Sequence, residues 1–513
     1  MAIKLLKYTI RLLFSFLTIA IVCGTMFAAQ HPGCYYNNFI LLPNYFYYSI
    51  SILLILFCIY RVKSYSVKNL YIKKFNFITT IIVIFILTVA LSIALWIPAD
   101  IQSDYLKIHS FAINFPNTFN INSSLYKYFL IFPYNLHAGT LFGIFFRIFH
   151  SWRAIIIIEM LFTFTACILT ALTVKNITRN KHLALIAFMI SVCLLCFNLR
   201  AATPYTDCSA MLCHTTAFYI YTSRTRNKLQ IPLIIILIAL GTYLKVTSLI
   251  IIIAIVIVEF IYNYKKLYRP RKLLIIASYT IIFIILLRGL PVVTYKLCNF
   301  TPEPDKELRL SYFLYLGQNT ETHGTVAHNN DWAYANSLKT AKSRDLTLFN
   351  GAYKRIVERG VVGNIKFIIN KLIVSYRDGL LDHHERHLLP TDYKRASNTL
   401  IGQIMLSKGR FFQFYAGIEQ TLWNSTLLLL LGSSLFIRKK NILTTAIIFT
   451  GSVAYILLFE NRACYVYMFV PYIIILAMQT LKMLTLLRSY YITRLNTNIF
   501  NLKTLLNSQG SHI

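Results

Sequence analysis

Acidic residues are scarce in this sequence and very unevenly placed. Only 18 Asp and Glu occur among 513 residues, and the first 99 residues contain none. Eleven of the 18 lie between Glu303 and Asp392. The first two, Asp100 and Asp104, follow a long apolar stretch that ends at Pro98. Because carboxylates near membrane-spanning segments are costly to keep, this position predicts a functional site.

The shortage of charge excludes a soluble protein. Charged residues make up 13% of the chain, hydrophobic residues make up 57%, and the mean hydropathy is +0.59. A soluble protein of this length cannot bury so much apolar surface. Many segments reach the roughly 17–25 apolar residues of a membrane-crossing helix, whereas a β-barrel would show roughly 10-residue alternating segments. The predicted fold class is therefore an all-α polytopic membrane protein.

The basic residues have a different distribution from the acids. The net charge is +33, but Lys and Arg occur in short clusters between apolar spans, which does not indicate nucleic-acid binding. Such clusters follow the positive-inside rule and favour contact with anionic membrane lipids. The ten cysteines lie mostly within apolar segments and are interpreted as packing residues, not as metal ligands or disulfides.

The apolar segments predict twelve membrane-spanning helices. They cover residues 8–29, 39–60, 76–98, 153–174, 182–199, 207–222, 229–243, 246–263, 272–291, 419–437, 441–459 and 464–483. If every basic cluster is cytoplasmic, both termini are cytoplasmic and the protein lies in the cell membrane. The short stretch 136–149 does not reach across a bilayer and predicts a helix at the outer interface.

This topology divides the chain into four regions. They are an N-terminal transmembrane domain at 1–291 with a large outer loop at 99–152, an extracytoplasmic domain at 292–418, C-terminal transmembrane helices at 419–483 and a cytoplasmic tail at 484–513. The extracytoplasmic domain holds most of the acids and is long enough to form a small soluble unit.

Asp104 is the first candidate for chemistry. A carboxylate at the outer end of a span can act as a general base that takes a proton from an acceptor hydroxyl. The alternative is an Asp in a loop that is solvated and has no catalytic role. Asp100 lies four residues earlier, and the two side chains would share a face if the helix continues. Paired carboxylates can hold a divalent metal or separate their pKa values.

Other charged residues also fall at predicted outer ends of spans. Asp207 either faces the same site or caps a helix. Lys245 lies between two apolar runs, where it either binds a lipid phosphate or extends to the interface. Glu460 and Arg462 either pair with each other, or Arg462 contacts a pyrophosphate. The segment 382–387 resembles a metal site in composition but lacks ligand spacing, so no metal site is predicted.

Short motifs follow one another over residues 90–475. They are Pro98, Ser103-Asp104 with Ala112, Phe132-Pro133-Tyr134-Asn135, Pro204-Tyr205-Thr206-Asp207, Gly241 with Lys245, LYLGQN and HGTVAHNND ending at Asp331, YKRIVERGVVGNIKFIINKLIVSYRDG ending at Asp378-Gly379, and Glu460 with Tyr465 and Pro471. In order and spacing they resemble the GT-C class of polyprenyl-phosphate-sugar-dependent membrane glycosyltransferases, and in particular the large Gram-positive membrane proteins of that type. The chain departs from that family at Cys464, where the family usually has Arg, and in two extra spans before the Asp104 loop.

The resemblance implies an inverting transferase that moves a sugar from a polyprenyl-phosphate donor to a cell-envelope glycan, lipid or protein on the outer face. The implied residues are Asp104 as base, Asp100 and Asp207 lining the site or helping to hold a divalent cation, Lys245 and Arg462 at the donor phosphate, and Asp331, Glu460 and Asp378 as further site-lining residues. The resemblance implies no other cofactor.

The sequence leaves two other classes of function open. A lipid-linked glycan flippase or transporter would place polar residues throughout its spans. A non-catalytic membrane protein of cell-envelope biogenesis would use the extracytoplasmic domain for binding alone. The acids of this chain crowd the outer ends of predicted spans, which favours chemistry on one side of the membrane.

Overall fold

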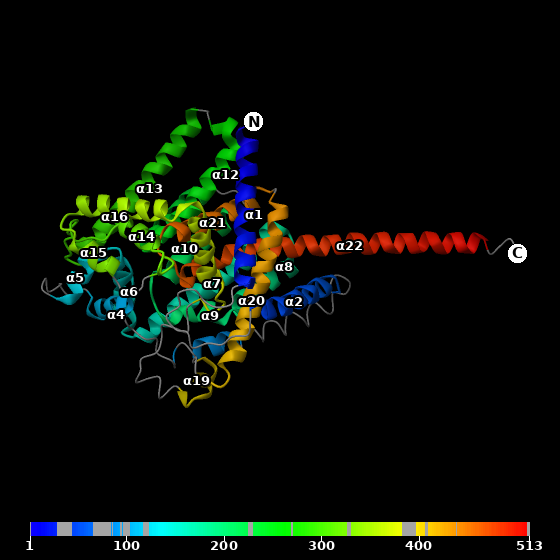
Figure 1. The fold of residues 1–513 in the computed structure, drawn as a ribbon, viewed down its shortest axis with the longest axis horizontal. Helices are drawn as coiled ribbons and strands as arrows, with labels where there is room; N and C mark the ends of the chain where they lie inside the picture. The colour runs from blue at the N-terminus through cyan, green and yellow to red at the C-terminus, as the bar shows by residue number, and fades with distance from the viewer. Residues whose placement is uncertain are drawn as a thin grey trace.

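The computed structural model describes residues 2–27, 44–64, 84, 86–92, 95, 103–115, 123–223, 229–267, 270–325, 330–381, 397–405, 409–437 and 439–509. Within these ranges the secondary structure is helical and contains no strand. The prediction of an all-α fold is therefore confirmed. Figure 1 shows the helices gathered into one body, from which the C-terminal helix projects.

The main helices follow one another along the chain. They are α1 (Ala2–Phe27), α2 (Asn44–Ser64), α4 (Ser103–Asn114), α5 (Ser124–Ile131), α6 (Asn135–Phe149), α7 (Trp152–Thr178), α8 (Lys181–Cys193), α9 (Leu195–Leu199), α10 (Thr206–Thr222), α11 (Gln230–Leu244), α12 (Leu249–Leu267), α13 (Pro270–Leu297), α14 (Leu310–Gly317), α15 (Asn330–Ser337), α16 (Ala341–Glu358), α17 (Gly360–Tyr376), α19 (Leu400–Met405), α20 (Phe412–Ser433), α21 (Lys440–Leu458) and α22 (Val470–Gln509).

Six helices in the described part are long and apolar enough to cross a membrane. Their stretches are Ile3–Phe27, Trp152–Thr178, Val246–Tyr264, Leu274–Leu297, Lys440–Leu458 and Ala463–Tyr491. Shorter apolar helices cover Asn44–Tyr60, Lys181–Cys193 and Gln230–Leu244. These helices support a multi-pass membrane protein, while the count of twelve spans and the orientation of the termini stay predictions. Most of the predicted span 76–98 lies outside the described residues.

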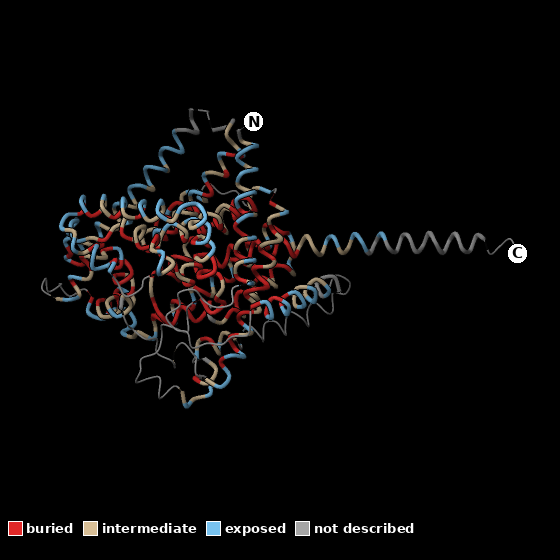
Figure 2. The backbone as a smooth tube through the Cα atoms, viewed as in Figure 1, coloured by how far each residue is buried: buried red, intermediate tan, exposed pale blue. Residues whose placement is uncertain are grey.

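The spans differ greatly in how deeply they are buried. The most apolar stretch within Ala463–Tyr491 is 94% buried inside the protein, whereas that within Leu274–Leu297 is 0% buried. The first half of α22 is therefore a central helix, and α13 presents apolar side chains outward, as a lipid-facing helix does. In Figure 2 the buried backbone fills the middle of the body and α13 is mostly exposed.

The helix α6 covers the predicted interfacial stretch 136–149 and packs against α4. Two glycines of α6 make this contact close, because a Cβ atom at Gly139 would lie 2.6 Å from the Phe111 ring and one at Gly143 would lie 2.6 Å from Phe115. The absence of a side chain at these two positions lets α4 lie directly on α6. The prediction of a helix is confirmed here, and its place at the outer interface stays a prediction.

The polar region 292–418 packs against the apolar helices. Its helix α17 lies against α1 and α21. Leu372, Tyr376 and Leu380 belong to the same hydrophobic core as the central part of α22. The residues predicted to form an extracytoplasmic domain therefore share a core with the transmembrane helices.

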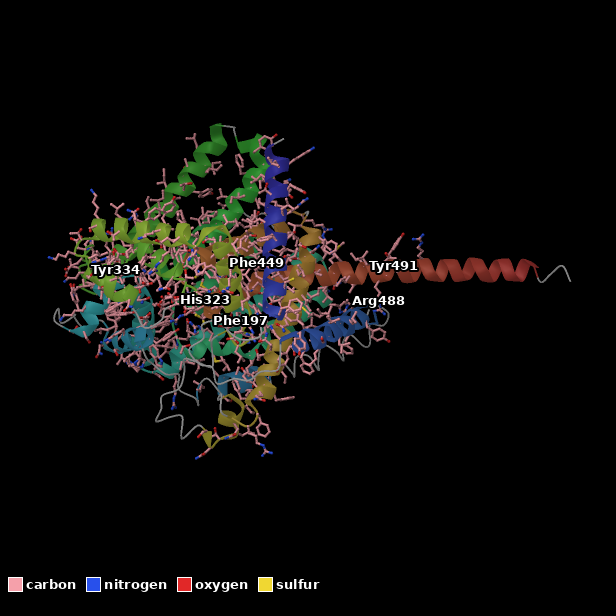
Figure 3. All side chains as sticks on the ribbon, viewed as in Figure 1. Phe197, His323, Tyr334, Phe449, Arg488 and Tyr491 are labelled. Atoms are coloured by element: carbon pink, nitrogen blue, oxygen red, sulfur yellow. The ribbon has the colours of Figure 1, made fainter. Side chains whose placement is uncertain are left out.

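The helix α22 continues well beyond residue 483, where the last predicted span ends, and reaches Gln509. Near the body it is held by Arg488, whose Nη1 donates a hydrogen bond of 2.8 Å to the Ile59 carbonyl. Figure 3 shows Arg488 and Tyr491 where α22 leaves the other helices. The first part of the predicted polar tail is thus helical.

Candidate functional site

Asp207 lies between two basic side chains. It occupies the first turn of α10, where the positive end of the helix dipole favours a carboxylate. One carboxylate oxygen accepts a hydrogen bond of 3.0 Å from Nη2 of Arg200, and the other accepts one from Nζ of Lys245. The exposed fractions of the Arg200 and Asp207 side chains are 5% and 2%. Two bases face one acid, so this trio carries one excess positive charge.

Three separate elements bring the trio together. Arg200 begins the 3₁₀ turn η2 (Arg200–Ala202), which follows α9, and Asp207 is the second residue of α10. Lys245 caps the C-terminal end of α11, which packs alongside α10. The antiparallel neighbours α10 and α11 therefore place the start of one helix beside the end of the other.

Asp104 reaches the same region through a chain of hydrogen bonds. It lies in the first turn of α4 and shares a hydrogen bond with Tyr128. Asn135 Nδ2 donates to the Tyr128 hydroxyl at 2.5 Å, and the Tyr205 hydroxyl donates to Asn135 Oδ1 at 2.9 Å. Tyr205 is two residues before Asp207. The first-loop carboxylate and the trio are thus parts of one polar cluster.

The tyrosines of this cluster are affected by Asp104. Burial raises the pKa of the Tyr128 hydroxyl, and the Asp104 carboxylate raises it further. Burial and then Asp104 raise the pKa of Tyr205 in the same way. A negative charge beside a phenol disfavours its ionised form. Both hydroxyls are therefore neutral hydrogen-bond donors over the physiological pH range.

A second set of contacts links α4 to the trio. Arg200 Nη2 donates a hydrogen bond of 2.9 Å to the Tyr105 hydroxyl. The rings of Tyr105 and Tyr205 meet edge to face with centroids 5.1 Å apart. Lys245 Nζ lies 6.0 Å from the centroid of Tyr205 and 5.5 Å from that of Tyr465, within the range of cation–π attraction.

The turn after α21 brings in Glu460 and Arg462. These side chains form an ion pair of 3.3 Å between Nε and Oε1, so the pairing alternative of the sequence is the one observed. The negative charge of Glu460 also acts on tyrosines of the cluster. Burial raises the pKa of Tyr134 most, and the charges of Asp104 and then Glu460 raise it further. Burial raises the pKa of Tyr312 on α14, and Glu460 adds most to this among the nearby charges.

Other residues predicted to line the site make local contacts. Asp331 accepts two hydrogen bonds from Arg355, of 2.7 and 3.0 Å, which fasten α15 to α16. Asp378 Oδ1 accepts a hydrogen bond of 2.8 Å from the Leu380 backbone at the end of α17. Asp100 and the segment 382–387 lie outside the described residues.

Comparison with known proteins gives one match. A protein family described as conserved hypothetical integral membrane protein matches residues 3–484. The chain belongs to this family. No curated protein and no solved structure matches it. The family match and the apolar helices both indicate an integral membrane protein, which contacts lipids.

In this member of the integral membrane family, the sequence did not single out Arg200. The signal was present, because Arg200 shares the short segment between two apolar runs with Asp207. The Nε and Nη1 atoms of Arg200 are buried and have no hydrogen-bond partner among the described residues. A buried guanidinium with unpaired N–H groups suits an anionic ligand.

Metal ligands do not gather in the part of the chain that the structure describes, since no group of three His, Cys, Asp or Glu side chains there could hold a metal ion. Asp104 has hydroxyl neighbours in Tyr128 and Tyr205, and Asp207 has basic ones in Arg200 and Lys245. The described cluster therefore suits proton transfer and anion binding.

His137 on α6 contacts Tyr243, which is two residues before Lys245. Its ring stacks on Tyr243 with centroids 4.2 Å apart, and its Nδ1 lies 2.8 Å from the Tyr243 carbonyl. Burial lowers the pKa of His137 to about 4, although the hydrogen bond to the Tyr243 carbonyl opposes this shift. His137 is therefore neutral at physiological pH.

Acid is expected to destabilise the protein through His137. The unfolded chain binds a proton near pH 6.5 and the folded chain only near pH 4, so stability falls as the pH is lowered between these values. The loss from this residue is about 3 kcal/mol. Denaturation midpoints of the wild type and His137→Phe, measured from pH 7.5 to 4, test this. Equal pH dependence in the two proteins would contradict it.

Proposed function

We propose that this protein is an inverting glycosyltransferase that moves a sugar from a polyprenyl-phosphate donor to an acceptor hydroxyl at the outer face of the membrane. The observation that carries the proposal is the cluster itself. The Asp104 carboxylate is linked by hydrogen bonds to Tyr205, two residues before Asp207, and at Asp207 the buried Arg200 and the part-buried Lys245 face one acid. A base beside an excess of positive charge is what sugar transfer from a lipid phosphate requires.

Asp104 is the proposed general base. Its carboxylate takes the proton of the acceptor hydroxyl while the acceptor oxygen bonds to the anomeric carbon. The bond between that carbon and the phosphate oxygen breaks, and polyprenyl phosphate leaves with the electron pair. Tyr128 donates to the Asp104 carboxylate and fixes its orientation. Orientation and deprotonation are the main demands, because a phosphate is already a good leaving group.

Arg200 and Lys245 are the proposed partners of the donor phosphate. Lys245 was predicted from the sequence, and Arg200 adds two buried N–H-bearing atoms without a partner among the described residues. Asp207 holds both bases in place and leaves one positive charge in excess. Arg462 is paired with Glu460, so it is a weaker candidate for this contact than Arg200.

The substitution Asp104→Asn is expected to lower the rate of sugar transfer at least about 100-fold, because it removes the proton acceptor and keeps the size of the side chain. Mass analysis of envelope glycans and lipid-linked sugars, in cells with and without the protein, first identifies the product. Product formation is then measured in membranes that contain each variant. Glu358→Gln, at an exposed position 61% accessible to solvent, is the matched control and should transfer at the wild-type rate.

Three results would decide against the proposal. Full transfer by a folded and membrane-inserted Asp104→Asn protein would overturn the assignment of the base. A protein that changes only the leaflet in which an intact lipid-linked glycan is found, and forms no new glycosidic bond, would be a flippase. If envelope glycans and lipid-linked sugars are the same in cells with and without the protein, the protein is not a transferase and the non-catalytic alternative is favoured.

A further inference from the structure

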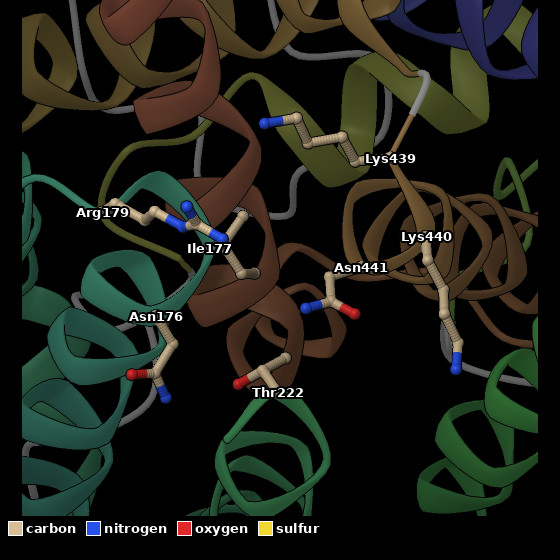
Figure 4. A pocket seen from close by; sticks show the side chains of 7 residues that line it. All are labelled: Asn176, Ile177, Arg179, Thr222, Lys439, Lys440 and Asn441. Carbon is tan, nitrogen blue, oxygen red and sulfur yellow. The ribbon is translucent and has the colours of Figure 1, made fainter. Parts of the chain in front are cut away.

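A basic pocket lies at the opposite ends of the helices that hold the candidate functional site. Asp207 is at the start of α10 and Thr222 is at its end, and a helix of 17 residues rises about 25 Å. The pocket has a volume of about 250 Å³. Its lining residues, shown in Figure 4, are Asn176, Ile177, Arg179, Thr222, Lys439, Lys440 and Asn441.

Positive charge gathers at this pocket. Arg179 and Lys439 are both within electrostatic reach of Lys482, whose Nζ donates a hydrogen bond of 2.6 Å to the Thr178 carbonyl. In the described ranges no carboxylate pairs with any of these three bases. Lys440 differs, since it forms an ion pair of 2.5 Å with Glu259. Figure 4 shows Lys439 extending toward the side of Arg179, while Lys440 points away.

Arg179 and Lys439 both lie at helix ends. Arg179 ends α7 in the left-handed conformation, with φ 59°, which few residues other than glycine adopt. Lys439 precedes the first turn of α21 and makes no side-chain capping bond there. The start of α21 adds the positive end of its dipole to the pocket. Like charges that line one pocket repel one another, and an anion bound between them relieves this repulsion.

We propose that this pocket binds the phosphate of an anionic membrane phospholipid. Guanidinium, ammonium, amide and hydroxyl groups supply the donors that a phosphate accepts. The pocket lies at the ends of apolar helices long enough to cross a bilayer, which is the depth of lipid headgroups. Ile177 adds an apolar wall for the glycerol end of a lipid, which free phosphate does not need. The site is independent of sugar transfer.

The test measures lipid binding to the purified full-length protein in neutral detergent by native mass spectrometry. Phosphatidylglycerol is expected to bind at least about tenfold more tightly than phosphatidylcholine. The substitution Lys439→Gln is expected to weaken phosphatidylglycerol binding about tenfold, the size of one charge-assisted hydrogen bond. Lys181→Gln removes a charge from an exposed site two residues after Arg179 but outside the pocket, and should change the affinity less than twofold.

Lys439 is exposed, so Lys439→Gln is not expected to disturb folding. Arg179→Gln, also at an exposed position, is a second variant that should weaken binding to a similar degree. Equal affinity for the two lipids, or unchanged binding by both pocket variants, would overturn the proposal. Inorganic phosphate is the competing ligand. Displacement of phosphatidylglycerol by an equal concentration of inorganic phosphate would identify a free-phosphate site and overturn the lipid assignment.

Discussion

Replacing Asp207 with alanine is expected to lower the free energy of unfolding by about 3–5 kcal/mol, the cost of leaving a buried charge without its partner. The side chains of Arg200 and Asp207 are 5% and 2% exposed, so the ion pair is almost fully removed from bulk water. Lys245, which is 16% exposed, loses the same partner. The two bases that shared the carboxylate then repel each other, and Arg200 is left as a buried unpaired charge.

The loss is measured by titrating the purified protein with SDS in mixed micelles. Asp345→Ala is the matched control, because Asp345 also pairs with an arginine, Arg309, at 3.2 Å, but both side chains are more than a third exposed. A pair of that kind contributes less than about 1 kcal/mol. Comparable losses in the two variants would show that the Asp207 pairs are not desolvated.

A double variant separates lost pairing from lost packing. If stranded charge causes the loss, Asp207→Ala combined with Arg200→Met is expected to be more stable than Asp207→Ala alone, because the second change removes one unpaired base. If Asp207 acted only as a space-filling helix cap, the two substitutions would add their separate costs. The sign of the coupling free energy distinguishes these two cases.

The sequence singled out three charged residues that lie together in the structure. Acids are so rare outside 303–392 that each one at the end of an apolar segment is conspicuous. Asp104 and Asp207 were singled out in this way, Lys245 was singled out as a base between two apolar runs, and the structure places all three in one cluster. Charge in a membrane protein is informative because burying it without a purpose is costly.

The sequence was insufficient where a role depends on how helices cross. Tyr128 is one of 35 tyrosines, and only the packing of α4 on α5 makes it the partner of Asp104. The extension of α22 to Gln509 is a different case, because residues 484–509 contain neither Pro nor Gly, and a helix there was predictable from the lack of a stop signal. The change from apolar to polar residues led to a predicted helix end at residue 483, whereas α22 ends at Gln509.

Lys371 connects the polar region to the turn that carries Glu460. Its side chain is fully buried, and Nζ donates hydrogen bonds to the carbonyls of Gly317 and Phe459, both at 2.7 Å, and of Leu457 at 3.1 Å. Burial lowers the pKa of Lys371 well below its usual value, the Arg359 charge lowers it further, and Glu460 opposes this shift. One amino group thus satisfies backbone carbonyls from two separate regions of the chain.

The substitution Lys371→Met is expected to lower the free energy of unfolding by about 3–5 kcal/mol, because three carbonyls lose their donor and each unsatisfied buried group costs about 1–3 kcal/mol. Methionine fills nearly the same volume, so a cavity contributes little. SDS titration measures the loss. Lys366→Met on the same helix is the control, and at its exposed position it should change stability by no more than about 0.5 kcal/mol.

The size of the Lys371 effect also tests how the polar region is held. Were region 292–418 attached mainly by the apolar contacts of α17 with α1 and α21, Lys371→Met and Lys366→Met would have similar effects. A large difference in stability between the two variants would show that Lys371 holds the C-terminal end of α14 to the turn after α21. Because Glu460 directly follows Phe459, that result would also identify Lys371 as the residue that positions the Glu460 turn beside Tyr134 and Tyr312.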